Sequence, residues 1–146
     1  MPGFVLNAGT TRGQTYRVFG QTVTERITAE DSGGAYYVME EVSPPGTGVP
    51  PHRHSHEDEI VQVLAGTFEV YLDGEVSVVE AGATLHFACG TRHGFRNVGT
   101  TDGRTLWFVT PGTATQAFLR ELSTFPEGPL DMARLAALHA AYGITM

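Results

Sequence analysis

Four side chains in this sequence have the chemistry of a divalent transition-metal site. His52, His54 and Glu59 lie in the segment GTGVPPHRHSHEDEIVQVLAG, which covers residues 46–66. His93 lies in the segment GATLHFACGTRHGFRN, which covers residues 82–97. Imidazole nitrogens combined with one carboxylate oxygen suit iron, manganese, nickel, cobalt, copper or zinc. The rest of the chain must therefore supply a framework that brings these four residues together.

The spacing of the first three residues predicts how they are placed. Side chains two apart on a strand point to the same face, so His52 and His54 project together. Glu59 has the opposite parity and needs a turn or bulge before it to share that face. The polar segment 55–58, with the sequence SHED, can form this turn. We therefore expect His56 to lie in the turn, near solvent, and not among the ligands.

Glu59 and His93 each lie on the face of an expected strand whose other residues are suited to the protein interior. Glu59 shares its face with Val61 and Val63, and a carboxylate at the end of an apolar wall needs a partner, for which a metal is the simplest choice. His93 follows the turn 89–92 and shares its face with Phe95 and Asn97. Taken alone, His93 would be a surface or hydrogen-bonded core histidine. Together with the other three residues, it is better explained as the closing member of a site.

Short strand-like segments predict an all-β framework up to about residue 110. They are rich in Val, Thr, Tyr and Phe and are bounded by turn residues, including the Asp73-Gly74 pair that favours a tight hairpin. Many short strands without intervening helices favour a jelly-roll sandwich or barrel. The expected strands are 15–19, 22–28, 35–42, 59–64, 67–72, 75–79, 84–88, 93–97 and 105–110. The Pro/Gly-rich stretch 43–51 is expected to be a loop that leads into the ligands.

The pattern changes after Pro111, where two helices are expected. Residues 115–122 carry apolar side chains at helical spacing, and residues 129–142 are rich in Ala and Leu. Gly128-Pro129 suits the start of the second helix and Gly143 its end. We expect a single domain over 1–146, with a barrel at roughly 15–110 and a helical tail at roughly 113–143 packed on the outside of the barrel.

Composition excludes several classes of function. A net charge of -7 with nine arginines and lysines leaves no basic stripe for nucleic acid and disfavours an anionic membrane surface. No apolar run approaches the length of a bilayer span, and the start of the chain does not resemble a signal peptide. The single cysteine, Cys89, excludes an intramolecular disulfide. These features predict a soluble, cytoplasmic protein that binds neither nucleic acid nor a membrane surface.

The first segment resembles the first motif of the cupin superfamily. The matching residues and spacing are Gly46, five residues, His52, one residue, His54, four residues, Glu59, six residues and Gly66. This resemblance implies the cupin fold, a double-stranded β-helix or jelly-roll barrel, here followed by two C-terminal α-helices.

The second segment resembles the second cupin motif. It has Gly82, then Gly90, two residues, His93, three residues and Asn97. Ala88 stands two residues before Gly90, where the family usually has proline, which predicts a looser turn without affecting a ligand. The two motifs together span residues 46–97, about a third of the chain.

The resemblance implies that His52, His54, Glu59 and His93 are the ligands of one divalent metal per chain. It further implies a homodimer and, among small cupins, a similarity to quercetin-dioxygenase-type proteins. The leading expectation is a metal-dependent dioxygenase acting on a small enolic or phenolic, flavonol-like substrate, with Glu59 doubling as the catalytic base. Two alternatives remain open at this point. One is a metal-dependent isomerase or polyketide-type cyclase, and the other is a non-catalytic small-molecule binding or sensor cupin.

Other residues are weaker candidates. His86 is expected to be a buried, hydrogen-bonded histidine, with support of the metal site as the alternative, and Cys89 a small buried thiol. Arg92 and Arg96 could steer an anionic substrate, although exposed positions on a turn are the simpler expectation. The aromatic residues that could line a pocket or belong to the ordinary core are Phe68, Tyr71, Phe87, Phe95 and Trp107.

Overall fold

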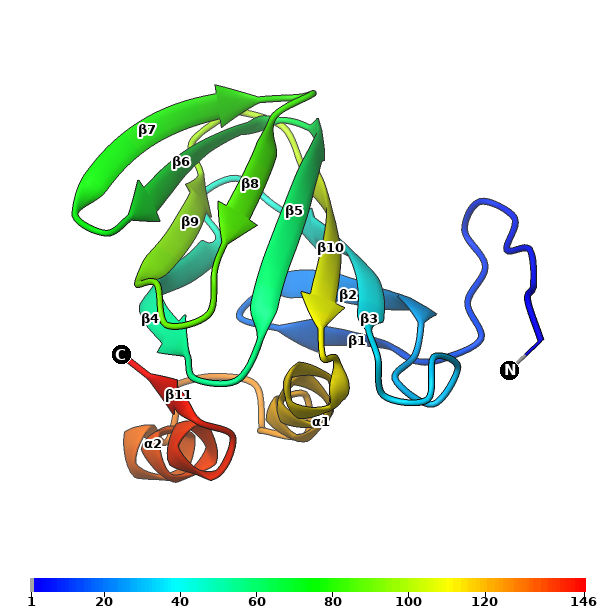
Figure 1. Cartoon of the computed structure of the whole chain (residues 1–146). Helices are drawn as coiled ribbons and strands as arrows, with labels where there is room; N and C mark the ends of the chain where they lie inside the picture. Colours follow the sequence, from blue (N-terminus) through cyan, green and yellow to red (C-terminus); the bar gives the residue numbers. More distant parts are fainter. Residues whose placement is uncertain (1) are drawn as a thin grey trace.

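The computed structural model describes residues 2–146 as two antiparallel sheets followed by two helices and a short last strand (Figure 1). The strands before the helices are β1 (Thr15–Val18), β2 (Gln21–Ile27), β3 (Tyr37–Ser43), β4 (Gly48–His54), β5 (Asp58–Ala65), β6 (Thr67–Leu72), β7 (Glu75–Glu80), β8 (Thr84–Phe87), β9 (His93–Asn97) and β10 (Gly103–Thr110). They are followed by α1 (Thr113–Leu122), α2 (Met132–Ala141) and β11 (Ile144–Thr145). The predicted all-β jelly-roll fold with two C-terminal helices is confirmed.

The strand order shows how the chain crosses between the sheets. One sheet has the order β1-β2-β3-β10-β5-β8 and the other the order β11-β4-β9-β6-β7. Consecutive strands β4 and β5 therefore lie in different sheets, as do β8 and β9 (Figure 1). The two cupin-like segments each cross from one sheet to the other, which places their histidines and glutamate around the space between the sheets.

That space is filled by the inward side chains of both sheets. Val61 and Val63 on β5 are fully buried, whereas Ile60 and Leu64 on the same strand are 40% exposed. This alternation confirms that Glu59, Val61 and Val63 share an inner face. The opposite sheet contributes Phe95, whose ring lies 5.3 Å from the ring of Trp107 on β10.

The β6–β7 hairpin forms at the predicted Asp73-Gly74 turn. Both residues have positive φ, 47° and 88°, as a tight two-residue hairpin turn requires, and Leu72 pairs with Glu75 across it. Phe68 and Val70 are buried, as expected, but Leu72 on the same face is 37% exposed. The reason is its position at the end of the strand, beyond the cover of the opposite sheet.

The expected loop at 43–51 is wrong in its second half, because β4 already begins at Gly48. Pro50 and Pro51 lie inside this strand, although proline lacks the N–H that a sheet ladder needs. They are tolerated because the pairing of β4 with β9 is irregular between Val49 and His52. The strand thus continues through the prolines and delivers His52 and His54 at its end.

The helices differ from expectation in where α2 begins and in what α1 covers. Helix α2 begins after Asp131, whose side chain caps it by accepting from the Arg134 N–H, and not at Gly128-Pro129. It ends at Ala141, and Gly143, with a φ of 68°, follows the C-cap residue Tyr142 and stops the helix as predicted. Helix α1 does not lie on the outside of a sheet but across one end of the barrel, where Phe118 and Leu119 face the interior (Figure 1).

Neither of the two helices in the described part of the chain is long and apolar enough to span a membrane.

Candidate metal centre

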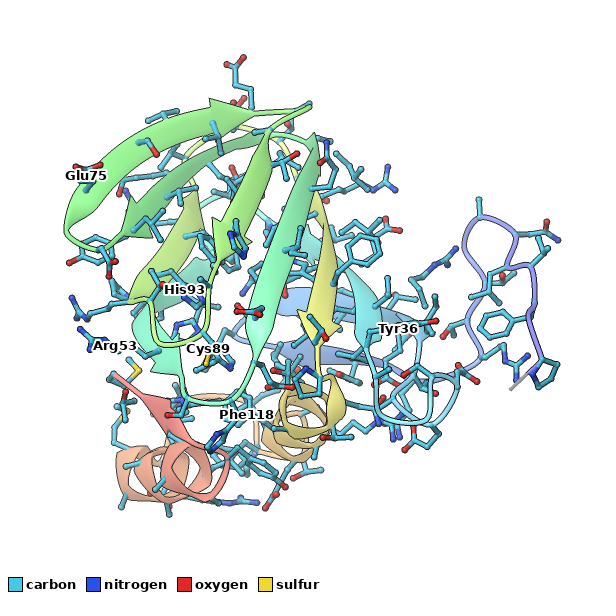
Figure 2. All side chains as sticks on the ribbon, viewed as in Figure 1. Tyr36, Arg53, Glu75, Cys89, His93 and Phe118 are labelled. Carbon is cyan, nitrogen blue, oxygen red and sulfur yellow. The ribbon has the colours of Figure 1, made fainter. Side chains whose placement is uncertain are left out.

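The fold brings His52, His54, Glu59 and His93 into one cluster. Their ligand atoms all lie within 4.8 Å of one another, and all four side chains are buried or nearly so. His52 and His54 come from β4 and His93 comes from β9 in one sheet, whereas Glu59 comes from β5 in the other. Figure 2 shows His93 inside the barrel, between the sheets. The site therefore depends on the packing of one sheet against the other.

The turn between His54 and Glu59 forms as the sequence predicts. Strand β4 ends at His54 and β5 begins at Asp58, with bends at Ser55 and His56. His56 is exposed and does not belong to the cluster. The turn changes the parity of the chain, so that Glu59 faces the same interior as the two histidines.

Backbone carbonyls fix the orientation of two imidazole rings. The Nδ1 atom of His52 lies 2.9 Å from the Pro50 carbonyl oxygen, and Nδ1 of His93 lies 2.9 Å from the Thr91 carbonyl oxygen. A carbonyl oxygen can only accept, so both Nδ1 atoms must donate. In the neutral rings, the Nε2 atoms then carry lone pairs that point into the cluster.

These inward atoms lie close to other electron-rich atoms. Nε2 of His52 is 3.1 Å from Nε2 of His54, which is itself 3.1 Å from Oε1 of Glu59. Nε2 of His93 is 2.9 Å from Oε2 of Glu59. Ligand atoms bonded to one ion at about 2.1 Å lie about 3–4 Å apart. The four side chains thus fit a divalent cation. Such a cation would bond to the facing Nε2 lone pairs and would balance the buried negative charge of Glu59.

The protonation of the cluster also suits metal binding. The pKa of His52 is lowered to about 4, chiefly by burial, which together with the neighbouring His54 and His93 outweighs the raising effect of the Glu59 charge. Burial works against ionisation of Glu59, but the adjacent His54, His93 and His52 outweigh burial and lower its pKa to about 2. His52 is therefore neutral and Glu59 ionised near pH 7, which are the forms that bind metals.

Neighbouring side chains hold the cluster in place. The ring of Phe87 stacks on that of His93 at 4.2 Å with an interplanar angle of 11°. Asn97 donates to the carbonyl oxygens of Ser43 and Thr101 at 2.8 and 2.9 Å and accepts from the Gly99 N–H at 2.8 Å. Phe87 and Asn97 thus fix the ring and the strand that present His93 to the other ligands.

A small cavity of about 60 Å³ adjoins the cluster. His52, His54 and Glu59 lie on its wall, and Phe95, Trp107, Phe118 and Leu119 provide much of its apolar lining. None of the described residues that line it is an arginine or a lysine. A cavity of this size has room for about two water molecules or for one end of a larger compound.

Glu57 is a residue of the site that sequence reasoning did not identify. It is buried within the turn between the ligands, where its carboxylate accepts from the hydroxyl and the N–H of Thr115 at 2.6 and 3.2 Å. Thr115 lies in the first turn of α1, where unpaired N–H groups favour a negative charge. Glu57 thereby attaches α1 to the ligand turn, and α1 in turn presents Phe118 to the cavity (Figure 2).

Glu41 on β3 is a second residue that the sequence did not reveal. It is 4% exposed and lines the same cavity as His52, His54 and Glu59. The only signal in the sequence is an alternation in the segment 37–43, in which Glu41 shares a face with Tyr37 and Met39. That signal is weak, because the adjacent Glu40 gives the segment no clear polar face.

Two of the weaker candidates lie elsewhere than expected. His86 is exposed, because the short strand β8 turns Phe87 inward and His86 therefore outward. Cys89 is exposed in the turn after β8, and the expectation of a buried thiol is wrong (Figure 2).

The arginines and most of the aromatic candidates do not line the cavity. Arg92 donates to the Tyr71 hydroxyl at 3.1 Å, and Arg96 is exposed on β9. Tyr71 and Arg96 line a separate, larger groove of about 380 Å³, which contains none of the four cluster residues. Phe68 and Phe87 are core residues, so that only Phe95 and Trp107 of the aromatic candidates line the cavity.

Two curated proteins of Streptomyces species are similar to part of this chain. The polyketide synthase CurC of Streptomyces cyaneus is 37% identical over 67 residues, which cover 46% of this chain and 44% of CurC. The protein SchB of Streptomyces halstedii is 36% identical over 67 residues, which cover 46% of this chain and 49% of SchB. The aligned region thus spans less than half of the length of either relative.

Solved structures share the fold. KdgF from a Halomonas species has a TM-score of 0.66 at 21% identity, covering 80% of this chain and 99% of that one. An RmlC-like cupin from Shewanella frigidimarina has a TM-score of 0.62 at 17% identity, covering 77% and 94%. A predicted oxalate decarboxylase from Thermotoga maritima has a TM-score of 0.59 at 25% identity, covering 62% and 79%.

The family model described as a cupin domain matches residues 39–109, a region that contains the whole cluster and most of the two sheets. This match covers slightly less than half of the chain, which is thus similar to cupin-domain proteins over that region and shares the fold of the solved structures.

Proposed function

We propose that His52, His54, Glu59 and His93 bind one divalent transition metal and that the chain is a metal-dependent enzyme for a small, uncharged enolic or phenolic compound. The observation that carries the proposal is the cavity itself. It places three of these residues beside an aromatic wall and includes no arginine or lysine among its described lining. Four protein ligands would leave coordination positions of the metal free for a substrate, as in catalytic metal sites.

The side chains that line the cavity offer an anionic substrate no cation besides the proposed metal itself. Glu59 and Glu41 both line it and would repel a carboxylate or phosphate group that extends beyond the metal. Arg92 and Arg96 do not line the cavity. Enols and phenols fit better, because they enter as neutral molecules and can lose a proton once bound.

The metal, Glu59 and the aromatic residues of the cavity would have different roles in the reaction. A bound metal would stabilise the deprotonated hydroxyl or polarise the carbonyl of a substrate. Glu59 would accept a proton from the substrate, since its carboxylate lies at the junction of the cluster and the cavity. Phe95, Trp107 and Phe118 would exclude water and hold an aromatic or planar ring.

The reaction class that we favour is proton transfer with ring closure or isomerisation, in which no oxygen is consumed. It is supported by the similarity to the polyketide synthase CurC, because poly-β-ketone chains are enolic and close into phenolic rings. The second candidate is a dioxygenase. It is supported by the donor set, since three imidazoles and one carboxylate also accept redox-active iron, manganese, nickel and copper.

Turnover with and without oxygen distinguishes the two candidates. The protein would be loaded separately with zinc, nickel, manganese and iron and offered a panel of β-diketones, naphthols and flavonols. The cyclase or isomerase proposal predicts equal rates in air and under strict anaerobiosis, including with redox-inert zinc. Oxygen uptake that matches substrate loss would instead support the dioxygenase. Tight binding without conversion by any metal form would contradict both and favour a binding protein.

A further inference from the structure

Glu41 is a buried carboxyl group whose hydrogen-bonding capacity is not met by the described part of the protein. Its Oε1 atom is inaccessible to solvent and has no hydrogen-bond partner there. A buried polar atom without a partner is unfavourable for folding, and most native proteins contain few of them. Such an atom in a cavity wall suggests that a ligand supplies the missing partner.

The other buried carboxylates do not share this property. Glu25 accepts two hydrogen bonds from Arg120, at 3.0 and 2.8 Å, and one from the Tyr37 hydroxyl at 3.0 Å. Glu57 is held by Thr115, and Glu59 lies within the histidine cluster. Glu41 is therefore distinguished from its neighbours by its lack of a partner, and not merely by its burial.

Polar groups near Glu41 are already used elsewhere. The Ser43 hydroxyl, two residues along β3, donates to Oε1 of Gln21 at 2.7 Å. The amide of Gln21 donates to the Gly48 carbonyl oxygen at 3.3 Å. The indole N–H of Trp107, on the adjacent strand β10, donates to the Thr105 hydroxyl at 2.8 Å.

Glu41 lies at a different level along the strands from the cluster of four metal-binding side chains. Thr105 on β10 pairs with Glu41 on one side and with Val63 on the other, whereas Val109 pairs with Glu59. Glu41 and Glu59 thus lie on the same inner wall, but at different levels along the strands. Glu41 and the cluster line the same cavity, so a compound that inserts one end into it can contact both.

We propose that Glu41 contacts the substrate directly. One oxygen of the substrate would face the cluster of four metal-binding side chains, and Glu41 would hydrogen-bond a second oxygen of the same compound. The inference rests on the proposed function and specifies its substrate class further: an uncharged compound with two separated hydroxyl or carbonyl oxygens. Burial and the charge of Glu59 raise the pKa of Glu41 to about 8. The carboxyl group can therefore donate as well as accept a hydrogen bond near pH 7.

Binding of simple phenols to the zinc-loaded protein tests this inference without requiring turnover. Phenol offers one oxygen for the metal, whereas resorcinol and hydroquinone add a second hydroxyl at the meta and para positions. Affinities are measured under anaerobic conditions by calorimetry for the wild type and for Glu41→Leu, Glu41→Gln and Glu75→Gln. Glu75 is an exposed carboxylate at the distant β6–β7 hairpin and serves as the matched control (Figure 2).

We expect resorcinol or hydroquinone to bind the wild type about three- to tenfold more tightly than phenol, the value of one added hydrogen bond. Glu41→Leu should abolish this advantage while leaving the affinity for phenol and the zinc content unchanged. Glu41→Gln, which keeps a donor and an acceptor, should retain part of the advantage, and Glu75→Gln should retain all of it.

The outcomes separate the failure of this inference from that of the proposed function. Equal binding of all three phenols by the wild type, or an advantage that survives in Glu41→Leu, would overturn the role of Glu41 alone. Failure of every phenol to bind the zinc-loaded wild type would overturn the proposed phenolic substrate and this inference with it. Because Glu41→Leu removes a buried group without a partner, we expect this variant to fold at least as stably as the wild type.

Discussion

The Nε2 atom of His93 lies 2.9 Å from Oε2 of Glu59, and this contact joins one sheet of the barrel to the other. The opposite nitrogen of the same ring donates to the Thr91 carbonyl oxygen, so a neutral His93 presents a lone pair to a carboxylate. Without a cation, the pair requires a proton between its members. A metal bound by both residues would remove this requirement.

The first prediction concerns metal content. The purified wild type should carry about one divalent metal per chain, because the four side chains converge on a single centre. His52→Ala and His93→Ala should each lose most of this metal, since either change removes an oriented imidazole. Elemental analysis of the purified proteins measures the effect.

His56→Ala is the matched control for metal content. His56 lies two residues from His54 but is exposed in the turn, so its removal should leave the metal in place. Full retention of metal in both ligand variants would refute the proposed site. Loss of metal in His56→Ala would refute the conclusion that His56 lies in the turn and does not bind the metal.

The second prediction separates two roles of Glu59. Glu59→Gln keeps the size of the side chain and one ligand oxygen but loses its basicity. If Glu59 accepts a proton from the substrate, turnover per bound metal should fall by about 10²-fold or more. Turnover and metal content are measured on the same preparations, and a ratio close to that of the wild type would leave Glu59 as a metal ligand only.

The third prediction concerns the pH dependence of stability in the metal-free protein. The pKa of Glu41 is raised from 4.5 to about 8 in the folded state, because burial and the charge of Glu59 disfavour its ionised form. The other titratable groups that line the cavity with it are Glu59, His52 and His54. A carboxyl group with a raised pKa contributes stability fully below pH 4.5 and loses that contribution as pH rises towards 8.

The wild type should therefore lose stability relative to Glu41→Gln between about pH 5 and 8, by up to about 1.4 kcal/mol per pH unit. Urea unfolding of both proteins at several pH values, in the presence of a chelator, measures the difference. Parallel stability curves for the two proteins across this range would show that Glu41 does not titrate as expected.

The fourth prediction concerns the attachment of α1 over the cavity. Arg120 on α1 holds the fully buried Glu25 through two hydrogen bonds. Arg120→Ala leaves this carboxylate without its charged partner and should lower the free energy of unfolding by about 3 kcal/mol. Arg104→Ala, which breaks an ion pair between the more exposed Arg104 and Glu40, should cost less than about 1 kcal/mol. Chemical denaturation measures the free energy of unfolding of both variants. Equal losses would show that the contact of Arg120 with Glu25 stabilises the fold no more than that of Arg104 with Glu40.

Local spacing in the sequence was enough to determine one half of the candidate site. Residues two apart on a strand share a face whatever the strand packs against, which placed His52 with His54 and Glu59 with Val61. The change of parity between His54 and Glu59 required a turn, and the polar segment 55–58 was the available one. The Asp73-Gly74 hairpin was equally local, because its positive φ values depend on the residues of the turn itself.

Only the tertiary structure decided what closes the site and what surrounds it. His93 reaches Glu59 across 34 residues, and Thr115 reaches Glu57 across 58, through contacts that depend on the register and packing of both sheets. The outward turn of His86 follows from how the four-residue strand β8 pairs with β5, for which so short a segment carries no reliable pattern. The burial of Glu41 beside the cavity, without a partner for its Oε1 atom, likewise became visible only when β3, β10 and β5 were placed side by side, because unmet hydrogen bonds are a property of all neighbours at once.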